Sequence, residues 1–189
     1  MARRIELPLT PELTATLRAG DAVALSGVIY TARDAAHKRF CELLDAGLPL
    51  PFDIRGATIY YAGPTPAAPG RVIGSVGPTT SYRMDAYAPR LLRLGQLGMI
   101  GKGARSAEVA DAVRETGAVY FGAVGGAGAL LSECVKSSEV VAFDELGAEA
   151  VHRLVVEDFP AVVVIDSGGR NLYEEGRAAY LRSVAELSD

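Results

Sequence analysis

Apolar positions along the chain follow two periodicities, and their alternation predicts strands that are followed by helices. Val23 and Leu25 alternate with small or polar neighbours, which is the period of a half-buried strand over 21–29. Phe40, Leu43 and Leu44 recur at the spacing of one helical face, so a helix is expected after residue 31. The same patterns predict strands at 57–61, 72–76, 119–124, 140–143 and 161–165, and helices from residue 10, over 84–92 with a kink or restart at Pro89, over 106–116 and over 172–187. Such alternation indicates an α/β domain with a mixed sheet.

Hydroxyl side chains mark the expected starts of three helices. Thr10, Thr31 and Ser106 each precede a helical pattern and can accept a hydrogen bond from a free backbone N–H of the first turn. Asp34 follows Thr31 at the spacing of a capping-box variant. Arg33 is then expected in the first turn of its helix.

The composition is that of one globular domain with a sizeable core. Of the 189 residues, 49% are hydrophobic and 22% are charged, so we expect a single domain over 1–189. The formal net charge of −4 argues against a nucleic-acid partner, because binding a phosphate backbone needs a broad basic face. No apolar stretch is long enough to span a bilayer, so no membrane partner is expected.

The two cysteines favour a reducing compartment. Cys41 and Cys134 lie far apart and lack Cys-x-x-Cys spacing, so no metal or cluster site is readable in this chain. Both thiols are expected to be buried or half-buried. Sparse cysteine, together with an N-terminus that has no apolar leader segment, predicts a cytoplasmic protein.

Three segments repeat one order of elements: an apolar strand, a tight turn and a cation. They are Ser26–Lys38, Gly77–Asp85 and Gly98–Gly103. The free N–H groups at a helix start attract a carboxylate or phosphate, and a nearby arginine can grip it with two parallel hydrogen bonds. Because the overall charge is negative, these local cations predict a small anionic ligand.

The three cations of these segments are candidates for one binding site. Arg33, Arg83 and Lys102 are each expected where a strand gives way to a turn or helix, the edge at which open α/β sheets bind ligands. If they converge, two guanidinium groups can hold the two ends of a four-carbon diacid, and Lys102 adds a point charge beside flanking glycines. The alternative is that both arginines are surface cations paired with Asp34 and Asp85.

The glycine-rich run 122–128 does not predict a nucleotide site. Its spacing misses G-x-G-x-x-G, and Lys102 is followed by Gly103 rather than by Ser or Thr, so there is no P-loop. A turn that lets the backbone approach the candidate site closely is the better interpretation.

Further short motifs continue in order through the chain, at Gly117–Gly126, Phe143–Gly147, Val156–Pro160 and Ile165–Tyr173. With the three cation segments, they resemble the β subunit, or C-terminal domain, of class I iron–sulfur fumarases and the related L-tartrate dehydratases. The likeness covers nearly the whole chain and implies a swivelling β/β/α domain, which composition could not have named. One departure lies at Tyr82, where the family motif often has Gly; a bulky side chain there would alter the turn or line the pocket.

Three further residues are candidates for the site. Thr79 and Thr80 have an ordinary explanation as helix caps. The resemblance implies instead that Thr79 moves the C3 proton of the substrate; the alternative is that Thr79 only hydrogen-bonds the substrate. Thr80 is a candidate substrate-binding group. A hydroxyl is a poor base unless positive charge stabilises its alkoxide, so this role needs the cations nearby. His37 lies four residues after Arg33 on the same helical face and is a candidate to relay a proton or fix a substrate carboxylate, but a lone histidine in such a position is more often a satisfied structural residue.

The function implied is that of the β subunit of a two-subunit class I fumarate hydratase, which hydrates a C4 dicarboxylate, fumarate, reversibly to L-malate. In the enzymes that it resembles, three cysteines of the α subunit bind a [4Fe–4S] cluster whose free iron holds the substrate. This chain lacks such ligands, so the cluster is expected from an α-subunit partner in a hetero-oligomer. The alternatives are the β subunit of an L-tartrate dehydratase or mesaconase-type hydro-lyase, and a non-catalytic carboxylate-binding module.

Overall fold

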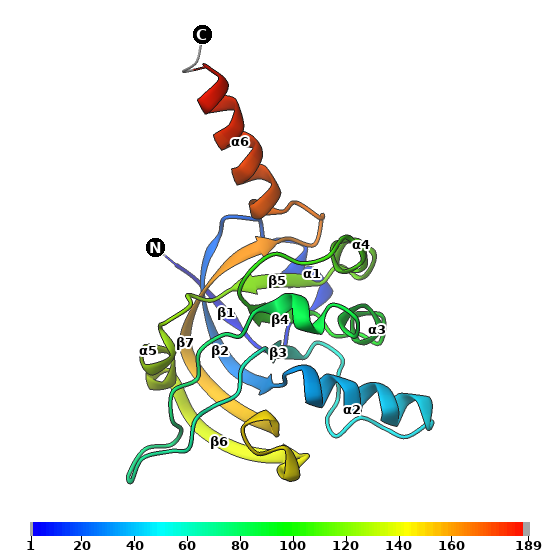
Figure 1. Ribbon diagram of the computed structural model, residues 1–189, viewed down its shortest axis with the longest axis vertical. Coiled ribbons are helices and arrows are strands. Elements are labelled where there is room, and N and C mark those ends of the chain that lie inside the picture. The colour runs from blue at the N-terminus through cyan, green and yellow to red at the C-terminus, as the bar shows by residue number, and fades with distance from the viewer. Residues whose placement is uncertain (1, 187–189) are drawn as a thin grey trace.

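The computed structural model describes residues 2–186, which form a seven-stranded mixed sheet with helices around it (Figure 1). β1 to β5 run parallel, and β7 pairs antiparallel with β2, β5 and β6. The pairing of β2 with β7 closes β2, β3, β4, β5 and β7 into a barrel-like ring. The strands, in spatial order, are β1 (Arg3–Glu6), β2 (Ala22–Thr31), β3 (Thr58–Tyr60), β4 (Gly98–Gly101), β5 (Val119–Gly122), β7 (Val151–Ile165) and β6 (Val135–Ala142). The expected α/β fold with a mixed sheet is confirmed.

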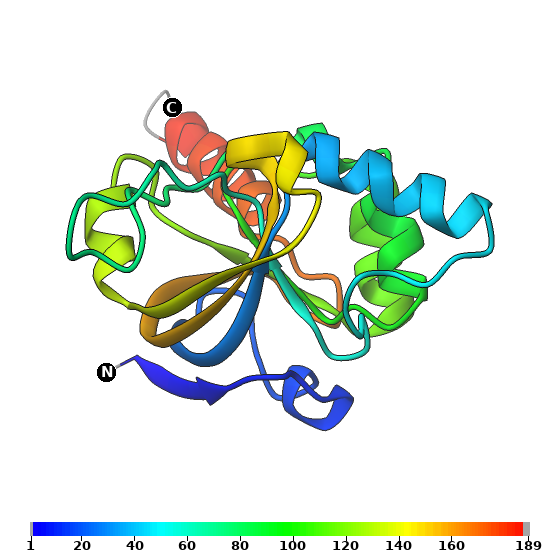
Figure 2. The same ribbon diagram turned by 90° about the horizontal axis from the view of Figure 1, so that it is seen from below.

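Helices cover the sheet on two sides. Figure 1 shows α2, α3 and α4 on one side and α5 on the other, and the turned view in Figure 2 agrees. The last helix, α6, projects away from the sheet. The α-helices are α1 (Pro11–Thr14), α2 (Asp34–Asp45), α3 (Ala88–Arg93), α4 (Ala107–Thr116), α5 (Gly128–Glu133) and α6 (Leu172–Glu186), and two 3-10 helices are η1 (Ser81–Met84) and η2 (Asp144–Glu149). None of the helices within 2–186 combines the length and apolar character needed to cross a lipid bilayer.

The core lies along the sheet. Val23, Leu25 and Ile29 of β2 are buried, as their alternation predicted. β3 and β4 are buried at every position, because elements cover both of their faces. Burial of these apolar side chains fixes the strand register, and the register in turn fixes which residues follow each strand.

Two of the three expected helix caps are confirmed. The Thr10 hydroxyl accepts from Leu13 N at 3.2 Å, and the Ser106 hydroxyl accepts from Val109 N at 3.4 Å. The expected cap at Thr31 is wrong, because this residue ends β2 and its hydroxyl accepts from His152 N at 3.1 Å. α2 therefore begins later than expected, at Asp34.

The strand expected at 72–76 is wrong. The segment is irregular, and Thr65 N donates to its Ser75 carbonyl at 3.0 Å in a loop-to-loop contact. A Cβ at Gly74 would lie 2.3 Å from the Thr65 carbonyl oxygen, so the two loops pack too closely for a regular strand with side chains. The helix expected over 84–92 is divided into η1 and α3, and Pro89 lies in the first turn of α3, which confirms the expected restart.

Candidate active site

The carboxyl ends of β2, β3, β4 and β5 meet at one edge of the sheet, which we call the cation edge. Arg33 follows β2 at this edge, Lys102 follows β4, and Gly125 follows β5. η1, which carries Arg83, is tied to the same edge because Ser81 N donates to the Lys102 carbonyl at 2.9 Å. The structure thus places all three predicted cations on one edge.

Two of these cations share one carboxylate. Arg83 Nη2 lies 2.8 Å from Asp34 Oδ2, and Arg33 Nε lies 3.9 Å from Asp34 Oδ1. Arg33 Nη2 also pairs with Glu149 Oε1 at 3.1 Å. The expected alternative pairing of Arg83 with Asp85 is wrong. Both guanidinium groups therefore lie near one carboxylate, although only Arg83 hydrogen-bonds it and the shorter contact of Arg33 is with Glu149.

The Arg33 side chain is held in a narrow space. A Cβ at Gly63 would lie 3.2 Å from Arg33 Cδ and 2.6 Å from the Ala148 carbonyl oxygen. Glu149 Oε2 accepts from Ala35 N at 3.2 Å, at the start of α2. Close packing against the glycine and the anchored Glu149 limits the directions in which the Arg33 guanidinium can point.

The two threonines precede η1 and are tied to the segments that follow β3 and β4. Thr79 N donates to the Tyr61 carbonyl at 2.7 Å, and Thr80 forms a bridge with Lys102. The expected capping role is wrong: Thr80 stands at the N-cap of η1 without a side-chain hydrogen bond. Across residues 2–186 neither threonine hydroxyl has a hydrogen-bond partner, and both side chains are half-buried, so both can meet a ligand.

Lys102 is a half-buried cation beside a glycine turn. Its Nζ lies 3.6 Å from the point where a Cβ at Gly125 would stand. No carboxylate of residues 2–186 lies within ion-pair distance of this ammonium group, unlike those of Lys38 and Lys136. An unpaired ammonium group on the cation edge is suited to a negatively charged ligand.

His37 is not brought to the cation edge. Its side chain is fully buried against the rings of Phe40 and Tyr61, and Nδ1 lies 2.8 Å from the Arg33 carbonyl. Because that carbonyl can only accept, Nδ1 carries the proton in the neutral ring. Burial lowers the pKa of His37 to about 4, against the opposing effect of the Arg33 carbonyl. The buried ring agrees with a structural position, but it is only half satisfied, because Nε2 has no hydrogen-bond partner among the described residues.

Sequence reasoning missed Arg105, Ser81 and Tyr120, which lie behind the cation edge. The Arg105 side chain is fully buried and pairs with Asp85 at 2.7 Å. Local sequence offered no reason to single it out, because a cation just before the cap of α4 resembles an ordinary surface residue. Its burial depends on rings that come from distant parts of the chain.

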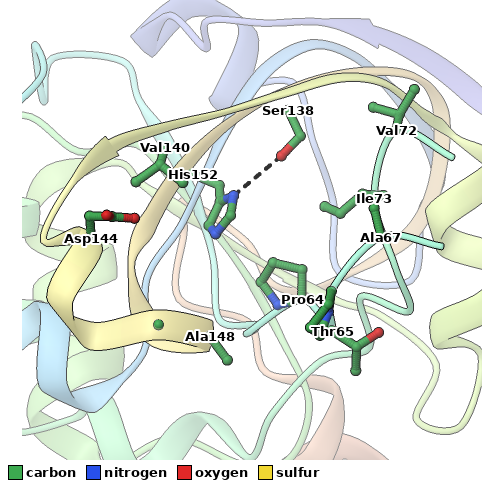
Figure 3. Close-up of a pocket in the computed structure, with 12 residues that line it drawn as sticks. Pro64, Thr65, Ala67, Val72, Ile73, Ser138, Val140, Asp144, Ala148 and His152 are labelled. Atoms are coloured by element: carbon green, nitrogen blue, oxygen red, sulfur yellow. Dashed lines mark hydrogen bonds between the residues drawn. The ribbon is translucent and has the colours of Figure 1, made fainter. Parts of the chain in front are cut away.

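A separate pocket of about 340 Å³ lies between the loop after β3 and the hairpin of β6 and β7 (Figure 3). Ser138 Oγ lies 3.2 Å from His152 Nδ1 on its wall, and burial lowers the pKa of His152, partly offset by Asp144. None of the six predicted site residues lines it. Ala148 borders both this pocket and the packing around Arg33.

The side chains present do not form a metal or cluster site. Among residues 2–186 no group of three His, Cys, Asp or Glu side chains is placed to hold a metal ion. Cys41 and Cys134 are both half-buried free thiols, as expected, and burial raises the pKa of each. The side chains described in the structure therefore do not provide a set of ligands that fits an iron–sulfur cluster.

The fold and the three cations define an α/β protein with a cationic site on one edge of its sheet. Comparison with known proteins assigns the chain to one family. The family model described as the fumarase C-terminus matches residues 1–176, so the chain belongs to this family. The resemblance expected from the sequence motifs is confirmed.

Relatives are similar over most of the chain. The class I anaerobic fumarate hydratase of Escherichia coli is 43% identical over 155 residues, which are 81% of this chain and 28% of the relative. Fumarate hydratase 2 of Leishmania major is 42% identical over 82% of this chain and 28% of its own length. A Methanocaldococcus jannaschii protein, provisionally named L(+)-tartrate dehydratase subunit beta, is 40% identical over 95% of both chains. The chain thus spans about a quarter of these fumarate hydratases and nearly all of the β subunit.

Proposed function

We propose that this chain is the β subunit of a two-chain class I fumarate hydratase, which adds water across the double bond of fumarate to give L-malate, and the reverse. One observation carries the proposal: Arg33 and Arg83 converge on the single carboxylate of Asp34, on the edge that also presents the unpaired Lys102. In this proposal a substrate carboxylate takes the position of the Asp34 carboxylate between the two arginines. Bidentate arginine contacts orient such a diacid.

The remaining roles follow from charge. During removal of the C3 proton, negative charge spreads onto the neighbouring carboxylate, and the Lys102 ammonium stabilises it. Thr79 is the proposed group that moves this proton, and Thr80 hydrogen-bonds the substrate. Support comes from their free hydroxyls beside the cations, since an alkoxide forms only where positive charge stabilises it.

A partner chain completes the proposed enzyme. The fumarate hydratase relatives are more than three times as long as the region that matches, whereas a relative named as a β subunit matches over 95% of its length. We propose that an α subunit supplies the segment corresponding to the rest of those enzymes. It also supplies the [4Fe–4S] cluster, because the residues described here do not fit one. The roles given to Arg33, Arg83, Lys102 and Thr79 do not pass through that cluster. A cytoplasmic location remains a prediction.

The principal test is anaerobic co-expression with an α subunit and comparison of wild type with Arg83→Lys. An ammonium group cannot reproduce the guanidinium fork, so turnover of fumarate is expected to fall on the order of 10²–10³-fold. Arg93→Lys is the matched control, because Arg93 also pairs with a carboxylate, Glu115, on an exposed helix surface between α3 and α4. Equal turnover in the two variants would remove Arg83 from the site.

A second candidate function is that of an L-tartrate dehydratase β subunit. It is favoured by the match over 95% of both chains to the relative so named. Tyr82, exposed beside Arg83, is a candidate contact for the second hydroxyl group by which tartrate differs from malate. Substrate profiling of the reconstituted pair with malate, tartrate and methylfumarate decides between these hydro-lyases. An inactive pair whose isolated β chain binds malate would favour the non-catalytic carboxylate-binding module.

A further inference from the structure

A buried hydrogen-bonded cluster adjoins the turn that carries Lys102. Its charged centre is Arg105, whose Nε donates to Asp85 Oδ1 at 2.7 Å. The other Asp85 oxygen accepts from Ser106 N at 2.6 Å, at the N-cap of α4. Replacing a buried ion pair by well-packed apolar side chains is often neutral or stabilising, so net stability is a weak explanation for the presence of this one.

The Arg105 guanidinium contacts two tyrosines that lead to the cation edge. Its carbon lies 5.2 Å from the ring centre of Tyr61 and 5.0 Å from that of Tyr120, within the range of cation–π attraction. The Tyr61 carbonyl accepts from Thr79 N, and the Tyr120 hydroxyl donates to the Gly103 carbonyl at 2.9 Å. Tyr61 therefore connects the Arg105 guanidinium to the segment of Thr79, and Tyr120 connects it to the turn of Lys102.

The hydroxyl groups of Ser81 and Tyr120 form a chain of hydrogen bonds that connects Lys102 to Gly103, and each hydroxyl donates towards Gly103. Because the Tyr120 hydroxyl gives its only proton to the Gly103 carbonyl, it accepts from Ser81 Oγ at 2.9 Å. Ser81 Oγ accepts from Lys102 N at 3.1 Å, and the Lys102 carbonyl accepts from Ser81 N at 2.9 Å. Gly103 N donates to the Tyr173 hydroxyl at 3.1 Å. Every backbone polar group of Lys102 and Gly103 thus has a protein partner.

Packing leaves the turn little freedom. A Cβ at Gly101 would lie 2.0 Å from Ser81 Oγ, so the strand can approach Ser81 only without a side chain. Gly103 has φ +84°, in the left-handed region that favours glycine. The backbone before and after Lys102 is therefore fixed, and only its side chain remains adjustable.

We propose that Ser81, Tyr120 and Arg105 are positioning residues, which hold the Lys102 turn so that its ammonium group meets the charge developing on a substrate carboxylate. The inference deepens the proposed function and rests on it for the reaction. Electrostatic stabilisation is effective only when the charged group is held in place before the reaction, which is what this cluster provides. Holding of the turn itself is a property of the chain alone and can be measured without a reaction.

The first experiment measures hydrogen exchange at the Lys102 and Gly103 amides of the full chain. Ser81→Ala and Tyr120→Phe each break the hydroxyl chain, and exchange is expected to become at least about tenfold faster. Arg105→Lys, which keeps the charge and loses the fork, should give a smaller increase. Ser132→Ala is the matched control: this buried serine donates to the Ala129 carbonyl within α5. Exchange that is unchanged in both hydroxyl variants would overturn the inference.

The second experiment is a double-mutant cycle on the reconstituted pair under anaerobic conditions. Ser81→Ala is expected to lower kcat about tenfold with little change in KM, because it acts on a group used in the transition state. In a Lys102→Ala background the same change should have no further effect, since the two residues act as one unit. A merely structural role of Ser81 would cost the same factor in both backgrounds.

The outcomes separate the two proposals. Equal costs of Ser81→Ala in both backgrounds would overturn the positioning inference and leave the proposed function intact. Unchanged turnover on Lys102→Ala would overturn the role of Lys102 in the proposed function, and with it the purpose assigned to the cluster.

Discussion

Two arginine–aspartate pairs on either side of η1 have nearly the same geometry and opposite surroundings. The Arg83–Asp34 contact is 2.8 Å long, with 41% and 32% of the side chains exposed, whereas the Arg105–Asp85 contact is 2.7 Å long, with 0% and 11% exposed. Water and ligands can replace Asp34 beside Arg83, because the pair is solvated. They cannot replace Asp85 beside Arg105 without leaving a buried charge unpaired.

In our proposals the exposed Arg83–Asp34 pair belongs to substrate binding, and the buried Arg105–Asp85 pair belongs to positioning. An exposed cation on a sheet edge is free to exchange one carboxylate for another, which is what a substrate site requires. A buried cation can only fix the groups around it, here Tyr61 and Tyr120. Contact length alone would have assigned both pairs the same role, so solvation is the property that distinguishes them.

The largest expected effect is on stability, from removal of the buried cation. Arg105→Met leaves Asp85 buried and unpaired, and the free energy of unfolding should fall by about 3–5 kcal/mol. Arg83→Met, the exposed counterpart, should change it by less than about 1 kcal/mol. Urea denaturation of the two variants measures both values, and similar losses would show that the two pairs are not distinguished by solvation.

Removal of the unpaired cation on the edge should affect the reaction and not the fold. Lys102→Ala is expected to lower turnover of the reconstituted pair on the order of 10²–10³-fold, equivalent to about 2.7–4 kcal/mol of transition-state stabilisation. Lys136→Ala is the control, because Lys136 is an exposed lysine of β6 that pairs with Glu157. Steady-state kinetics with fumarate and malate measure the effect; matching rates in the two variants would contradict it.

The next prediction concerns the pH dependence of the free energy of unfolding, to which the buried His37 contributes. Its pKa is lowered to about 4 in the folded chain from 6.5, so between these values the unfolded chain binds the extra proton and the folded chain does not. The contribution of neutral His37 is complete above pH 6.5 and is lost as the pH falls towards 4, by about 3 kcal/mol.

Urea unfolding of wild type and His37→Gln at intervals from pH 7 to pH 4 measures this contribution. The wild type should lose stability more steeply than the variant over that range. Parallel curves would show that His37 titrates alike in the folded and unfolded chain.

The smallest effect should come from salt. The exposed Arg83–Asp34 pair is screened by ions, so the stability difference between wild type and Arg83→Met should shrink by less than about 0.5 kcal/mol when NaCl rises from about 0.1 to 1 M. The difference for Arg105→Met should stay constant, because ions do not enter its surroundings. A comparable salt response of the buried pair would show that the two pairs do not differ in solvation.

Much of the fold was predictable because it depends on neighbours along the chain. Alternating apolar residues located β2, and the caps at Thr10 and Ser106 were assigned correctly from local hydrogen-bonding chemistry. The errors at Thr31 and at 72–76 share one cause. In both cases a distant partner competed with the local pattern: His152 N for the Thr31 hydroxyl, and the 64–66 loop for the would-be strand.

The candidate site was also predictable only where its placement depends on neighbours along the chain. Strand, turn and cation in order were enough to predict that Arg33 and Lys102 lie on one sheet edge, because the carboxyl ends of parallel strands meet there. Arg83 lies at this edge for a different reason: the strand expected before it is absent, and the hydrogen bond from Ser81 N to the Lys102 carbonyl holds η1 there. His37 could not be placed, since the rings that bury it come from several elements. Its helical position was compatible with either an exposed or a buried ring.

The sequence by itself determined the α/β fold, its family and the cations of the edge, because periodicity, turns and ordered motifs are local properties. Only the tertiary structure decided which charges are solvated. Arg105 became a buried centre through the packing of Tyr61 and Tyr120 from distant segments, whereas Arg83 stayed partly exposed. Solvation depends on everything that surrounds a group in space, and no stretch of neighbouring residues contains that information.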